Sequence, residues 1–103
     1  MSDRYEGKPF LRLLDSYVLA AIGALDKPNA DWLTAAEPHF RATFGGTGTW
    51  REIVEGRMQF PAGMEAAIVA VWEAGRAKFL EQTGEDPDPV QFAHTFVDTN
   101  FPN

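Results

Sequence analysis

The chain has no cysteine, so it forms no disulfide bond and performs no thiolate chemistry. It also lacks an apolar run near the roughly 20 residues that a membrane-spanning helix needs, and its first residues lack the pattern of a signal peptide. Basic residues are scarce, since nine Lys and Arg stand against 15 Asp and Glu, giving a net charge of −6. Because this charge repels phosphate backbones and anionic lipids, we expect a protein that binds neither nucleic acid nor membranes. The lack of cysteine suits a reducing compartment, so we expect a cytoplasmic protein.

Apolar residues, by contrast, are abundant. They make up 45% of the 103 residues, and 13% of the chain is aromatic, which suffices for one compact core. No segment alternates as a strand does, whereas apolar residues recur at helical spacing. The sequence therefore predicts an all-α fold, a compact bundle of about five helices in a single domain spanning residues 1–103. The expected helices are 9–26, 31–44, 50–59, 63–83 and 89–100.

Capping residues, prolines and glycines set these helix boundaries. Thr49 and Glu52 have the spacing of a capping box, and Asp88 followed by proline is typical of a helix start. Lys27-Pro28-Asn29 is expected to stop the first helix. Pro38 leaves two alternatives for the second helix: a kink at the proline, or a capping box of Thr34 and Glu37 with the helix beginning at Ala35.

The first helix has a wide apolar arc, which predicts that it is the central element, with Asp15 and Ser16 on its narrow polar side. The helix 63–83 has two different faces. One is expected to be buried and carries Met64, Ile68, Val71, Trp72, Gly75 and Phe79; the other is a smooth stripe of Ala66, Ala70, Ala74 and Ala77. The expected core residues are Leu14, Val18, Ile68, Trp72 and Phe96.

The two histidines are candidates for metal binding or acid–base chemistry. His94 and Asp98 are one helical turn apart, a spacing suited to a metal site but also common for an exposed pair, which is the preferred interpretation. His39 lies at the edge of an apolar arc and is interpreted as a partly buried, hydrogen-bonded histidine rather than a general base. We expect no metal and no cofactor.

Arg57 falls in the middle of the face that helix 50–59 should bury. A buried guanidinium would need a carboxylate partner, but the preferred alternative is a charged head that reaches solvent over an apolar stem. The preceding segment Gly45-Gly46-Thr47-Gly48-Thr49 is glycine-rich, yet it lacks the strand and the lysine of a phosphate-binding loop. It is interpreted as a connector to a capped helix.

Acidic residues concentrate near the end of the helix 63–83, where Glu81, Glu85, Asp86 and Asp88 lie within eight residues. Their spacing does not fit an EF-hand loop. They are therefore interpreted as a solvated acidic loop, with docking of a basic protein partner as its functional variant.

No stretch carries a catalytic signature, so the first hypothesis is a small acidic protein that acts by protein–protein binding, as an inhibitor, an immunity protein or an adaptor does. The second is a homodimer or larger homo-oligomer formed through the alanine stripe. The third is an enzyme or small-ligand-binding protein, which would need His39, His94 and Arg57 to converge in a pocket between helices.

Overall fold

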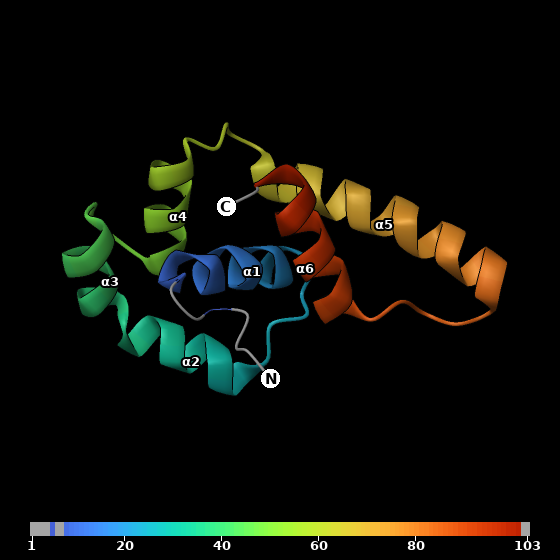
Figure 1. Cartoon of the computed structure of the whole chain (residues 1–103), viewed down its shortest axis with the longest axis horizontal. Helices are drawn as coiled ribbons and strands as arrows, with labels where there is room; N and C mark the ends of the chain where they lie inside the picture. Colours follow the sequence, from blue (N-terminus) through green and yellow to red (C-terminus); the bar gives the residue numbers. More distant parts are fainter. Residues whose placement is uncertain (1–4, 6–7, 102–103) are drawn as a thin grey trace.

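The computed structural model describes Tyr5 and residues 8–101, and these residues form six helices and no strand (Figure 1). The all-α prediction is confirmed, but the number of helices is six rather than about five. None of the described helices combines the length and hydropathy that crossing a membrane requires. The helices are α1 (Pro9–Ala21), α2 (Lys27–Ala35), α3 (Glu37–Phe44), α4 (Trp50–Met58), α5 (Met64–Thr83) and α6 (Pro89–Asn100).

The additional helix arises at Pro38, where the predicted segment 31–44 is two helices. Proline has no N–H to donate and its ring clashes with the preceding turn, so the chain breaks at Ala36 and Pro38 occupies the first turn of α3. The alternative capping box is absent. The Thr34 hydroxyl donates to the Ala30 carbonyl, and Glu37 accepts the backbone N–H of Trp50 instead.

The predicted end of the first helix is also wrong. The helix ends at Ala21 rather than at residue 26, because Gly23 adopts a φ of 74°, a left-handed conformation that glycine tolerates. Lys27 and Pro28, which were expected to stop this helix, instead form the first turn of α2.

The later boundaries follow the predicted capping residues. Thr49 and Glu52 form the reciprocal capping box of α4, and the Asp88 carboxylate accepts the backbone N–H of Val90 at the start of α6. Gly84 ends α5 in a left-handed conformation. These two helix starts and the end of α5 are confirmed.

Helix α1 is the central element, as predicted, because it packs against α4, α5 and α6 (Figure 1). Its surroundings bury almost its whole circumference, including Asp15 and Ser16, which are 1% and 8% exposed. The predicted polar side of α1 is therefore wrong, since α6 covers the side that carries Asp15. Of the expected core, Leu14, Val18 and Ile68 are buried, whereas Trp72 and Phe96 are only half-buried.

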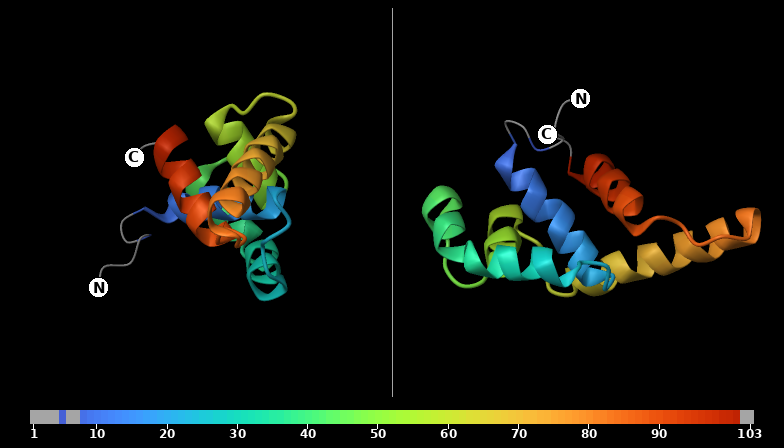
Figure 2. Two further views of the ribbon diagram at one scale, coloured as in Figure 1. Left: turned by 90° about the vertical axis from the view of Figure 1, so that its right-hand side faces the viewer. Right: turned by 90° about the horizontal axis from the view of Figure 1, so that it is seen from below.

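Helix α5 extends beyond the helices that it packs against (Figure 2, right). It has 20 residues and α1 has 13, which makes α5 about 10 Å longer at 1.5 Å per residue. Consequently only the first part of its predicted buried face meets the core: Ile68 is fully buried, but Val71, Gly75 and Phe79 are exposed. The radius of gyration of 14.3 Å is slightly above the ~13 Å of a compact chain of this length.

Candidate functional site

The part of α5 that extends beyond the core is the most exposed apolar element of the described chain. We call residues 71–83 the outer segment; all of them are exposed except Trp72, which is half-buried. Val71, Phe79 and Leu80 are 48%, 41% and 46% exposed. Trp72 attaches the segment to the body, since its ring lies 5.0 Å from that of Phe92 in α6. The outer segment thus presents large apolar side chains on a helix whose base is fixed.

Acidic groups surround this segment. Residues 70–90 contain five acidic and two basic side chains, and one of the two basic ones is already paired, because Arg76 Nε donates to Asp86 Oδ1 at 2.8 Å. Glu81 and Glu85 are exposed. The described residues contain no group of three or more His, Asp or Glu side chains suited to holding a metal ion. Glu81, Glu85 and Asp86 are exposed and form an acidic rim at the end of α5.

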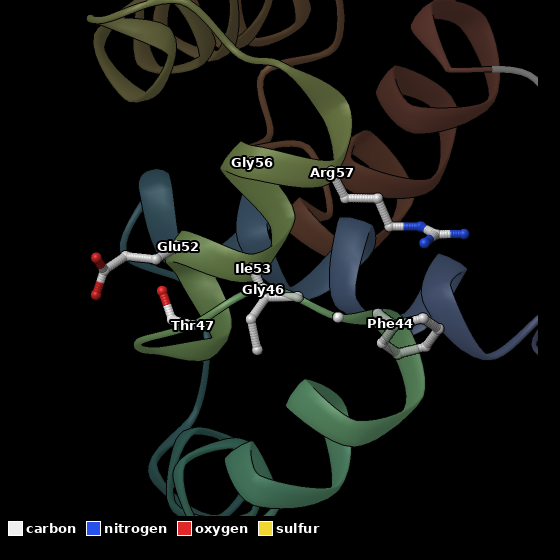
Figure 3. Close-up of a pocket in the computed structure, with 8 residues that line it drawn as sticks. Phe44, Gly46, Thr47, Glu52, Ile53, Gly56 and Arg57 are labelled. Carbon is white, nitrogen blue, oxygen red and sulfur yellow. The ribbon is translucent and has the colours of Figure 1, made fainter.

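A second candidate region is a cleft between the end of α3 and the outer side of α4 (Figure 3). Its volume is about 580 Å³, and its floor includes Phe44 and Ile53. The connector that closes one side is held by several hydrogen bonds. Arg41 donates to the Gly48 carbonyl at 2.8 Å, and Glu37 accepts the Trp50 N–H at 3.0 Å. The rim of the cleft is therefore fixed by α3 and α4 themselves.

Arg57 lies at one end of this cleft and is exposed. Its guanidinium carbon is 4.9 Å from the ring centroid of Phe10 and 5.4 Å from that of Phe44. The hypothesis of a buried arginine with a carboxylate partner is wrong, and the alternative, a charged head over an apolar stem, is confirmed. The helix α4 turns this position outward from the core, and the two aromatic rings take the place of an ionic partner.

The histidines lie elsewhere. His39 is exposed, with its ring 6.1 Å from that of Phe40, so the prediction of a partly buried histidine is wrong. His94 is half-buried, and its Nε2 is 3.6 Å from Oδ2 of the buried Asp15. Asp98 is exposed. His94 therefore faces α1 rather than lying with Asp98 on a solvated face, because α6 docks with that side against α1.

The structure does not bring the three residues of the enzyme hypothesis together. Arg57 lines the cleft between α3 and α4, His39 lines a hollow formed with Arg12 and Trp32, and His94 lines another with Ser16 and Leu19. Each of the three residues thus lines a different one of these hollows. The Asp15–His94 pairing gave no sequence signal, because the two residues come from helices at opposite ends of the chain.

Comparison with known proteins found no matching family model, no matching curated protein and no matching solved structure.

Proposed function

We propose that this protein acts by binding another protein through the outer segment of α5. The observation that carries the proposal is the exposure of Val71, Phe79 and Leu80 on a helical segment that no described element covers. Single exposed apolar residues are ordinary. Val71 and Phe79 lie toward one side of the helix, about two turns apart, and Leu80 lies toward the other side. Large apolar side chains gathered around one segment in this way are typical of an interaction surface. Removing them from water upon binding would contribute about 25 cal/mol per Å² of apolar area.

The charge around the segment selects the kind of partner. Five acidic side chains against two basic ones give residues 70–90 a net charge of −3, and Arg76 is paired with Asp86. A second copy of this chain would bring the same negative charge and be repelled, whereas a partner with Lys and Arg around an apolar groove would be attracted. The proposed partner is therefore a basic protein that receives α5 in such a groove.

The helix is also formed before binding. Ile68 and Trp72 fix its base in the body, and the ion pair between Arg76 and Asp86 joins it to the returning loop. A preformed segment loses little conformational entropy when it binds, so more of the interaction energy remains as affinity.

The test compares the wild type with two matched variants as bait in an extract of the source organism. Val71→Ser with Phe79→Ser removes two of the three large exposed apolar side chains of the outer segment, while Trp32→Ser removes a comparably exposed side chain from α2. We expect one basic protein in stoichiometric amount with the wild type and with Trp32→Ser, and at least roughly tenfold less with the double variant.

Two further results sharpen this test. Moderate salt should weaken the complex, as should Glu81→Lys with Glu85→Lys, because both reduce the electrostatic attraction. Equal capture by the double variant, in a preparation whose circular dichroism shows it folded, would refute the outer segment as the docking surface.

A further inference from the structure

The cleft between α3 and α4 has the composition of a site for a small anion with an apolar body. Ligand sites usually measure about 300–1,000 Å³ and combine apolar walls with a few polar groups. This cleft has about 580 Å³, with Phe44 and Ile53 as apolar lining and Arg57 as its only cation. Figure 3 shows Arg57 above Phe44 at one end of the cleft and Glu52 at the other end. The carboxylate of Glu52 is directed away from Ile53.

Arg57 retains its capacity to bind an anion. Within residues 8–101, no carboxylate forms an ion pair with it, and its recorded partners are the rings of Phe10 and Phe44. An aromatic ring attracts the positive charge of the guanidinium through its face. It offers no acceptor to the five N–H groups, which point outward in the plane of the guanidinium. The two rings therefore position the guanidinium and leave its N–H groups available to a planar bidentate acceptor, as a carboxylate is.

Gly56 provides a second observation at the same site. It lies within α4, where glycine is the least favourable residue after proline, and it lines the cleft. A Cβ atom added there would have nothing within 4 Å, so the packing of this chain does not require the glycine. Its absent side chain instead keeps the wall of the cleft open beside Arg57.

We propose that this cleft binds a small monocarboxylate with an aromatic or aliphatic body. The carboxylate pairs with the Arg57 guanidinium, and the body lies over Phe44 and Ile53 beside Gly56. The cleft has one cation, Arg57, and the negative charge of Glu52 opposes it, in a protein of net charge −6. A ligand with a single negative charge therefore suits the cleft better than the dianionic form of phosphate. This site is separate from the outer segment of α5, so its test is independent of the protein-binding proposal.

Phenylacetate is a suitable probe because it combines one carboxylate with one ring. Titration into isotope-labelled protein, followed by amide NMR shifts, should give saturable changes confined to residues 44–57 with an affinity of about millimolar, as expected for so small a ligand. Phenylacetamide, which has the same body without the charge, should bind roughly tenfold more weakly. Inorganic phosphate tests whether an anion without an apolar body binds to the same site.

Two variants and one control decide the outcome. Arg57→Gln should weaken phenylacetate binding by roughly tenfold, whereas Arg51→Gln should leave it unchanged, because Arg51 stacks on Trp50 outside the cleft. Gly56→Leu keeps Arg57 but fills the cleft and should abolish binding, which preserves the test if Arg57→Gln fails to fold. Unchanged affinity in either cleft variant, absence of shifts at residues 44–57, or phosphate binding as tight as phenylacetate would overturn the proposal.

Discussion

Tyr17 shows how one residue makes this fold depend on pH. Its side chain is 2% exposed, and its hydroxyl donates to Glu55 Oε2 at 2.9 Å. Burial raises the pKa of Tyr17 above its ordinary value, and the hydrogen bond and the negative charge of Glu55 raise it further. The folded protein therefore holds a proton that the unfolded chain releases near pH 10.

The stabilisation from this raised pKa is fully present below about pH 10 and is lost as the pH rises further, by up to about 1.4 kcal/mol per pH unit. We expect the free energy of unfolding in urea to fall more steeply above pH 10 for the wild type than for Tyr17→Phe. The same change at the half-buried Tyr5 serves as the control. Parallel curves for the wild type and Tyr17→Phe would show that Tyr17 ionises freely in the folded state.

For single residues, the sequence predicted the burial of side chains within one helix better than the contacts between side chains of different helices. Leu14, Val18 and Ile68 are buried as expected, because each lies at the centre of an apolar arc. Asp15 and His94 were both assigned to solvated faces, since nothing in either helix alone indicates that the other covers it. The position of Arg57 beside Phe10 likewise depends on the docking of α4 against α1, which periodicity does not contain.

Among the helices, α5 is the one whose two ends differ most in burial. Its predicted end at residue 83 is confirmed, as expected for a long segment whose termination signal, Gly84, is strong, and its start lies one residue later than predicted, at Met64. Its predicted face is correct only as far as Trp72, because amphipathic spacing shows which side of a helix is apolar but not how far its neighbours extend. Pro38 illustrates a related limit: a proline indicates a break, but the local sequence left open where the break falls.

This difference along one face of α5 is directly measurable. Ile68→Ala should lower the free energy of unfolding by about 2–5 kcal/mol, because it leaves a cavity in the core. Phe79→Ala, on the same face but in the outer segment, should change it by no more than about 0.5 kcal/mol, as surface substitutions do. Chemical denaturation of both variants checks this, and a neutral Ile68→Ala or a costly Phe79→Ala would contradict the described position of α5.

For the whole molecule, the exposed alanine stripe of α5 bears on whether two copies of the chain associate. Ala66, Ala70, Ala74 and Ala77 are exposed in this structure, so the stripe on which the homodimer hypothesis depends is accessible. The net charge of −6 acts against pairing of two copies, and we rank a basic partner first. Alanine is also a good helix former, which accounts for the stripe without any partner.

Sedimentation of the wild type and of Ala70→Glu distinguishes these alternatives. We expect both to sediment as monomers at low ionic strength, where the repulsion between acidic copies is strongest. A wild-type dimer that Ala70→Glu dissociates would instead support self-association through the stripe. Thr95→Glu, which adds the same charge at an exposed position of α6, controls for the change in net charge.

The central position of α1 also has a consequence for how the chain acquires its structure. Asp15 and His94 join helices about 80 positions apart, and closing so long a loop costs entropy before the contact is gained. During synthesis, α1 leaves the ribosome long before α6 exists. Its α6-facing side therefore stays uncovered while α2 to α5 are made, and this side of the core closes only after α6 has been translated.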